Sequence, residues 1–97
     1  IKYSGKTNKK VKRIAWCGGS GSFLLQNSIK KKADVFITGD CKYHEFFDHE
    51  NKVIIADIGH YESEQFTIDL IANFLKENFN KFAVHLSVVN SNPVNYY

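Results

Sequence analysis

A short apolar run followed by glycine, a polar residue and a helix-forming stretch occurs three times, and this pattern constrains the fold most. The instances are Trp16-Cys17-Gly18-Gly19-Ser20-Gly21-Ser22, Ile37-Thr38-Gly39-Asp40-Cys41-Lys42 and Asp57-Ile58-Gly59-His60-Tyr61-Glu62. Such a sequence is typical of a strand that turns into a helix. If the three strands are parallel, the three turns share the carboxyl edge of one sheet, where open α/β sheets bind ligands. We therefore expect functional residues in these turns.

The distribution of β-branched and aromatic residues predicts the order of the elements. Strands are expected at residues 11–17, 33–38, 52–57 and 81–89. Helices are expected at residues 22–32, with Ser22 as the cap, and at residues 42–50 and 61–79. The alternation predicts an α/β fold, βαβαβαβ, with a largely parallel central sheet flanked by helices. Residues 90–97 are expected to be irregular.

The length of 97 residues and the 43% hydrophobic content favour a single α/β domain over residues 1–97. The chain begins with Ile1 and contains no methionine, so we expect it to be a fragment of a longer protein. No apolar run reaches the roughly 20 residues of a membrane helix, which predicts a cytoplasmic protein. Cys17 and Cys41 lack CxxC spacing and are expected to be reduced thiols.

Positive charge is concentrated at the start of the chain. The first thirteen residues contain six lysines and arginines and no acid, whereas the rest contains seven basic and ten acidic residues. Basic segments can bind nucleic acid through phosphates, but this one has no aromatic row beyond Tyr3 and no docking motif. We therefore interpret residues 1–10 as a solvated basic connector, with a nucleic-acid interface as the weaker alternative.

His60 and Glu64 form the first candidate site. They are four residues apart at the start of a predicted helix, which projects both side chains from nearly the same face. Imidazole and carboxylate are ligands shared by zinc, manganese and iron. Capping of the helix by the glutamate is the competing interpretation. Two ligands also fall short of the three that a catalytic zinc usually keeps.

The stretch Gly18-Gly19-Ser20-Gly21-Ser22 is a second candidate. Its backbone amides could cradle a phosphate or carboxylate at the start of a helix, although it completes neither a Walker loop nor a dinucleotide fingerprint. The alternative is a tight turn that needs small residues. Gly19, Ser20 and Gly21 are therefore candidate substrate-binding residues.

Asp40 and His44 repeat the acid and imidazole chemistry in the second turn. They could serve as acid, base or hydrogen-bonding groups in the same cleft. The alternatives are helix capping for Asp40 and an ordinary helix-face position for His44. No serine or cysteine has the surroundings of a nucleophile, so no catalytic residue is assigned.

Together, three blocks resemble the Nif-three-like family, often named GTP cyclohydrolase I type 2 homolog. They are Ala15 to Ser22, Ala33 to Glu45 and the segment Ala56-Asp57-Ile58-Gly59-His60-Tyr61-Glu62-Ser63-Glu64. The resemblance implies a subunit of two similar α/β halves, a ring-shaped hexamer and a pair of divalent metals. This chain resembles the carboxy-terminal half.

The resemblance also implies roles for residues. The histidine and glutamate of the family's closing motif bind the metals and correspond to His60 and Glu64, while the amino-terminal half supplies the other ligands. The glycine loop and Asp40 would line the same cleft. The family name implies a metal-dependent hydrolase of a small nucleotide-like substrate, with the isolated fragment inactive. The alternative is a metal-binding or regulatory scaffold without turnover.

Overall fold

A computed structural model describes residues 1–5, 8 and 10–97 of the chain. These residues form two compact units, which we name unit 1 (Ile1–Glu64) and unit 2 (Gln65–Tyr97). None of the helices in the described residues is long and apolar enough to cross a membrane.

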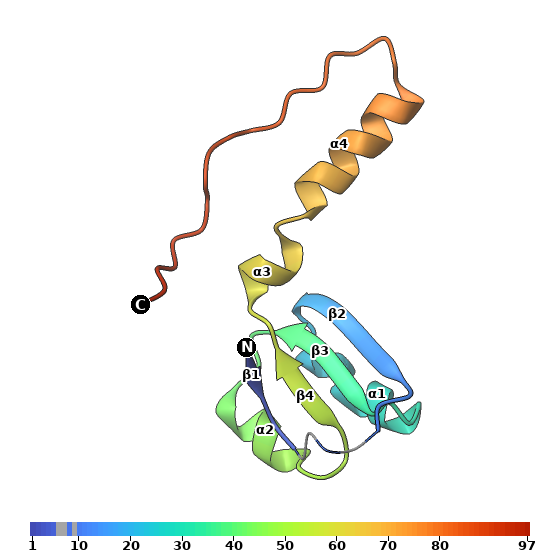
Figure 1. Ribbon diagram of the computed structural model, residues 1–97, viewed down its shortest axis with the longest axis vertical. Coiled ribbons are helices and arrows are strands. Elements are labelled where there is room, and N and C mark those ends of the chain that lie inside the picture. Colours follow the sequence, from blue (N-terminus) through green and yellow to red (C-terminus); the bar gives the residue numbers. More distant parts are fainter. Residues whose placement is uncertain (6–7, 9) are drawn as a thin grey trace. The chain divides into compact units, whose positions relative to one another are not determined.

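Unit 1 is built on a four-stranded sheet in the order β1-β4-β3-β2 (Figure 1). The strands are β1 (Lys2–Tyr3), β2 (Ile14–Ser20), β3 (Val35–Gly39) and β4 (Ile54–Asp57). β2 pairs with β3 and β3 with β4 in parallel, while β1 pairs antiparallel with β4. The predicted α/β class and largely parallel sheet are therefore confirmed.

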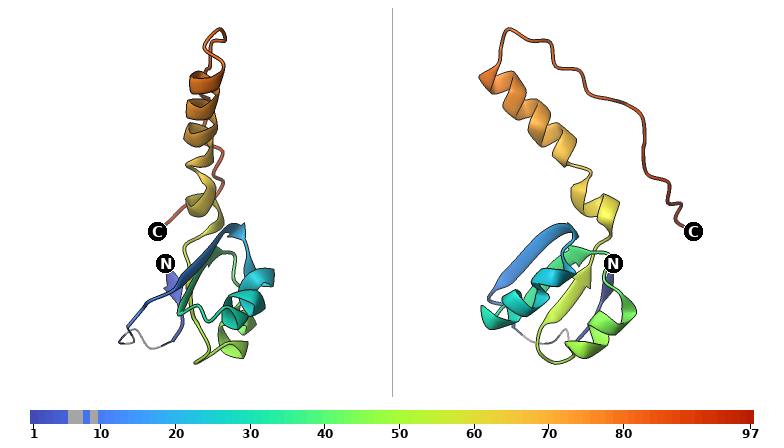
Figure 2. Two further views of the ribbon diagram at one scale, coloured as in Figure 1. Left: turned by 90° about the vertical axis from the view of Figure 1, so that its right-hand side faces the viewer. Right: turned by 180° about the vertical axis from the view of Figure 1, so that it is seen from behind.

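Helices cover one face of this sheet. A 3₁₀ turn, η1 (Ser22–Leu24), leads into α1 (Leu25–Lys30), and α2 (Tyr43–Asp48) connects β3 to β4. α1 and α2 lie on the same side of the strands (Figure 2). The buried core between sheet and helices consists of Leu25, Ala33, Phe36, Cys41, Val53 and Ile55. α3 (His60–Glu64) follows β4 at the carboxyl edge of the sheet.

Within unit 1, the opposite face of the sheet is apolar and carries neither α1 nor α2. Because side chains alternate along a strand, the residues between the core positions point to this face. They are Ile14, Trp16, Val35, Ile37, Ile54 and Ala56, in matching register across β2, β3 and β4. Trp16 is 76% exposed and Ile14 is 50% exposed. Neither α1 nor α2 covers this face.

Several predicted boundaries are wrong. The first strand begins at Ile14 rather than residue 11, because the amides of Lys12 and Arg13 donate to the Asp34 carboxylate instead of joining the sheet. Ser22 does not cap a helix. Gly21 holds that position, and Ser22 is the first residue of the 3₁₀ turn η1.

The basic connector also differs from its prediction. Within residues 1–10, Lys2 and Tyr3 form β1 and pair with β4. Positions 6, 7 and 9 lie outside the described residues.

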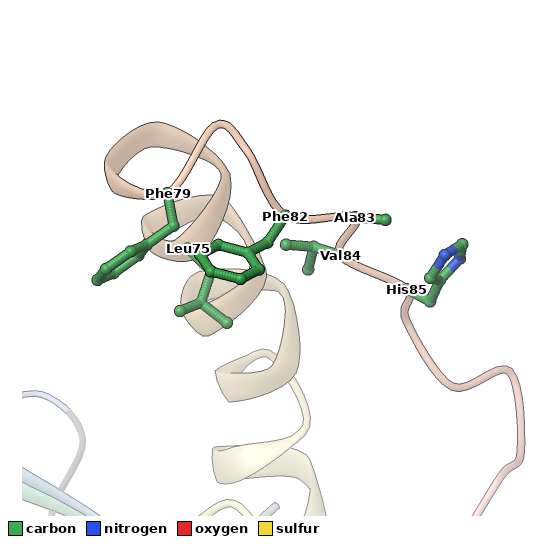
Figure 3. A pocket seen from close by; sticks show the side chains of 6 residues that line it. All are labelled: Leu75, Phe79, Phe82, Ala83, Val84 and His85. Atoms are coloured by element: carbon green, nitrogen blue, oxygen red, sulfur yellow. The ribbon is translucent and has the colours of Figure 1, made fainter.

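Unit 2 contains α4 (Thr67–Asn78) and an extended segment. The predicted helix at 61–79 is interrupted at Gln65 and Phe66, which lie between α3 and α4. The predicted strand at 81–89 does not form. Instead, Phe79 and Phe82 contact edge to face, with ring centroids 6.4 Å apart. A shallow groove at the end of α4 is lined by Leu75, Phe79, Phe82, Ala83, Val84 and His85 (Figure 3).

Candidate metal centre

The three glycine turns of unit 1 meet at the carboxyl edge of the sheet, as the repeated pattern predicts. The Gly21 amide donates to the Thr38 hydroxyl at 2.9 Å, which links the first turn to β3. Gly39 lies so close to the third turn that an added Cβ would stand 2.7 Å from the Gly59 carbonyl oxygen. Only a residue without a side chain allows this approach. Residues far apart in sequence therefore gather at one edge.

His60 and Glu64 lie one above the other on α3. Nε2 of His60 is 3.2 Å from Oε2 of Glu64, and the two side chains are 52% and 51% exposed. The acidic residue in the first turn of α3 is Glu62 rather than Glu64. The Glu64 side chain thus faces His60 instead of capping the helix.

Asp40 contacts the other nitrogen of the same imidazole. Its Oδ2 lies 2.5 Å from Nδ1 of His60, so the Nδ1–H group donates to the carboxylate. This hydrogen bond is the main cause that raises the pKa of His60 above its ordinary value, with the Glu64 charge contributing. Asp40 does not cap α2. Lys42 holds that position, and its amide donates to Glu45.

Gly19 provides the space that Glu64 occupies. Its φ is +61°, in the left-handed region, and an added Cβ would lie 2.3 Å from Oε1 of Glu64 and 3.4 Å from Nε2 of His60. Its amide donates to the Ser63 hydroxyl at 2.8 Å, which ties the glycine turn to α3. A glycine is therefore required here by both conformation and contact.

The cluster of side chains formed by His60, Glu64 and Asp40 does not include the other predicted binding residues. The amides of Gly19 and Gly21 are engaged in hydrogen bonds within unit 1, which fits the tight-turn interpretation better than an open anion cradle. Ser20 is exposed at the end of β2. His44 is exposed on α2, and among the described residues no hydrogen bond joins it to Asp40, His60 or Glu64.

Asp57 was not singled out from the sequence, yet it is the buried acid nearest these turns. It is 2% exposed and ends β4. Burial alone would raise its pKa, but hydrogen bonds from Lys2, Gly59 and Cys41 outweigh burial and hold the pKa below its ordinary value. The sequence did contain a signal for this role, namely an acid at the end of an apolar strand. An acid buried at such a position needs partners that compensate its charge.

The donor set fits a divalent metal. Two donors bound to one zinc at about 2.0–2.2 Å lie roughly 3.4 Å apart at a tetrahedral angle. The distance of 3.2 Å between Nε2 and Oε2 is close to that value. A carboxylate on the second nitrogen of a ligating histidine is also the usual partner at metal sites. The described residues contain no group of three or more His, Cys, Asp or Glu side chains arranged to hold one ion.

Comparison with protein families gives one match over most of the chain. The model of the family described as Duf34/NIF3 (NGG1p interacting factor 3) matches residues 1–93. Among curated proteins, the "GTP cyclohydrolase 1 type 2 homolog" of Staphylococcus aureus strain MSSA476 is 35% identical over 101 residues. The alignment covers 99% of this chain and 27% of that relative, so the chain spans about a quarter of the relative's length.

Solved structures show the same similarity. The crystal structure of Staphylococcus aureus protein SA1388 matches with a TM-score of 0.80 and 33% identity, over 99% of this chain and 33% of that one. A Bacillus cereus protein described as related to NIF3 matches with a TM-score of 0.71 and 25% identity, over 99% and 28% of the two chains.

Proposed function

The chain belongs to the Duf34/NIF3 family, and we propose that it is the metal-binding half-domain of a longer protein, with His60 and Glu64 as two ligands of a dinuclear divalent-metal site. The observation that carries this proposal is the convergence of three side chains. Nε2 of His60 faces the Glu64 carboxylate while Nδ1 faces Asp40. Zinc, manganese and iron are the ions that this imidazole and carboxylate pair suits.

Each residue has a distinct part in this site. Asp40 accepts the Nδ1 proton of His60, which orients the ring and leaves the Nε2 lone pair for the ion. Glu64 supplies an anionic oxygen beside that nitrogen. Gly19 leaves the space in which the Glu64 carboxylate lies. Two ligands from this chain require others to complete the coordination.

We propose that the amino-terminal half of the same longer protein supplies those ligands. The alignment covers only 27% of the curated relative's length, which supports a larger protein. The apolar face of the sheet opposite α1 and α2 supports it too, because parallel sheets are normally covered on both faces. The hexameric ring implied by the family resemblance is part of the same proposal.

For the longer protein we propose a metal-dependent hydrolase that acts on a small nucleotide-like substrate. Bound divalent ions would supply an activated water at neutral pH. The name of the curated relatives supports this activity class. We propose Ser20, which is exposed at the same edge, and Asp40 as substrate-binding groups, with Gly19, Gly21 and His44 as further candidates.

An assay of the metal-loaded longer protein against nucleotides and phosphorylated small molecules tests this proposal. Turnover is expected, and Glu64→Ala should abolish it. Glu50→Ala, which changes an exposed acid in the turn after α2, should not. Metal binding that depends on Glu64 but gives no turnover with any of these compounds would contradict the hydrolase and select the scaffold alternative. The isolated 97-residue chain is expected to bind metal weakly and without turnover.

A further inference from the structure

We propose that Asp57 is a positioning residue that holds Asp40 against His60 by anchoring the backbones of the second and third glycine turns. This inference rests on the proposed function, because it concerns the geometry of the His60 imidazole. Asp57 itself is 2% exposed and does not face the solvent at the site. Its action therefore has to pass through its hydrogen-bond partners.

The two oxygens of Asp57 reach two different turns. Oδ1 accepts the amide of Gly59 at 3.0 Å, and Oδ2 accepts the amide of Cys41 at 3.2 Å. Gly59 directly precedes His60, and Cys41 directly follows Asp40. One buried carboxylate thus fixes the backbone beside each member of the Asp40 and His60 pair.

Both anchored turns contain unusual backbone conformations. Asp40 has φ +55° and Gly59 has φ +91°, so both lie in the left-handed region. A non-glycine residue in this region is costly unless its surroundings hold it there. The hydrogen bond from the Cys41 amide supplies such support immediately after Asp40. Without it, Asp40 is free to return to an ordinary conformation and leave Nδ1 of His60.

Lys2 compensates the negative charge of the buried Asp57 carboxylate. It lies opposite Asp57 in the β1 and β4 register, and its Nζ is 2.9 Å from Oδ2. A buried carboxylate needs such compensation to stay ionised. An ionised carboxylate accepts with both oxygens, whereas an asparagine offers one acceptor and one donor. Asp57→Asn therefore must leave one of the two amides without its acceptor.

The first test uses the metal-free 97-residue chain and reads the ¹⁵N chemical shifts of the His60 imidazole at constant pH. Asp40→Ala defines the shift of Nδ1 without its acceptor. Asp57→Asn should move the Nδ1 resonance toward that position, whereas Asp48→Asn, the same change at the exposed end of α2, should not. An unchanged Nδ1 shift in folded Asp57→Asn would overturn the proposal, as would an equal change in Asp48→Asn.

Amide hydrogen exchange in the unaltered chain gives a second readout that does not depend on a folded variant. The amides of Cys41 and Gly59 should exchange slowly, and exchange at the rate of exposed loop amides would overturn the anchoring. In the longer protein, Asp57→Asn should weaken zinc affinity about 10- to 100-fold, as loss of an outer partner does at other sites. Unchanged affinity would overturn the proposal. Zinc binding that does not respond to His60→Ala would instead refute the proposed function.

Discussion

The carboxylate of Asp40 lies 2.5 Å from Nδ1 of His60, although twenty residues separate them in the chain. The contact joins the turn after β3 to the start of α3. It selects which nitrogen of the imidazole carries the proton and leaves Nε2 directed at Glu64. The site is therefore a property of the sheet edge rather than of the Gly59 to Glu64 segment alone.

Asp40→Asn should weaken zinc binding by the longer protein about 10- to 100-fold, since an amide orients the imidazole less strongly than a carboxylate does. Isothermal titration calorimetry measures the change. Asp48→Asn, on the exposed end of α2, is the matched control and should bind as the unaltered protein does. Equal affinities for the two variants would contradict the role assigned to Asp40.

Gly19→Ala should displace the Glu64 carboxylate, because the new Cβ would lie 2.3 Å from Oε1 and φ is +61°. We expect the free energy of unfolding to fall by roughly 1–3 kcal/mol and zinc binding to weaken. Gly18→Ala is the control. Its Cβ would meet only ordinary contacts, at 3.6 Å from the Ser63 carbonyl oxygen, so stability should change by less than about 1 kcal/mol. Chemical denaturation showing equal losses would refute this account.

Acid should destabilise unit 1 partly through Asp57. Its pKa in the folded chain lies below the ordinary value of 3.8, so the unfolded chain binds the proton more readily. The stabilisation is fully present above that ordinary value and is lost as the pH falls through the folded-state pKa. Denaturation curves between pH 2 and pH 7 should show this loss in the unaltered chain and a shallower loss in Asp57→Asn. Parallel pH profiles would disagree with this assignment.

The two cysteines should react at different rates. Cys41 is buried, and burial raises the pKa of its thiol to about 11, with Glu45 and Asp57 adding to the effect. Cys17 is half-buried. Because the thiolate is the reactive form, iodoacetamide at pH 8 should modify Cys17 first and Cys41 only on unfolding. Mass spectrometry of tryptic peptides over time checks the order, and faster labelling of Cys41 would contradict it.

The sequence predicts the three parallel strands β2, β3 and β4 because β-branched residues cluster before each glycine turn. It could not show β1, whose two residues are recognisable only by pairing with β4. It also could not show the break at Gln65 and Phe66, since apolar spacing continues across them without glycine or proline. The failed strand at 81–89 shows that local strand propensity is insufficient without a pairing partner.

At the site, the proximity of His60 and Glu64 could be predicted from the sequence, because a helix places residues four positions apart on one face. The contacts of Asp40 with His60 and of Asp57 with two turns could not be predicted from the sequence. They depend on the parallel register of β3 and β4, which places Thr38 opposite Asp57. Long-range hydrogen bonds of this kind do not produce a periodic pattern of residues in the sequence.

Metal content tests the central claim most directly. The longer protein, its His60→Ala and Glu64→Ala variants and the control His85→Ala should be purified identically and analysed by inductively coupled plasma mass spectrometry, with circular dichroism to confirm folding. We expect bound zinc, manganese or iron in the unaltered protein and in His85→Ala, and a clear loss in both site variants. Unchanged metal content in folded His60→Ala and Glu64→Ala would contradict the account.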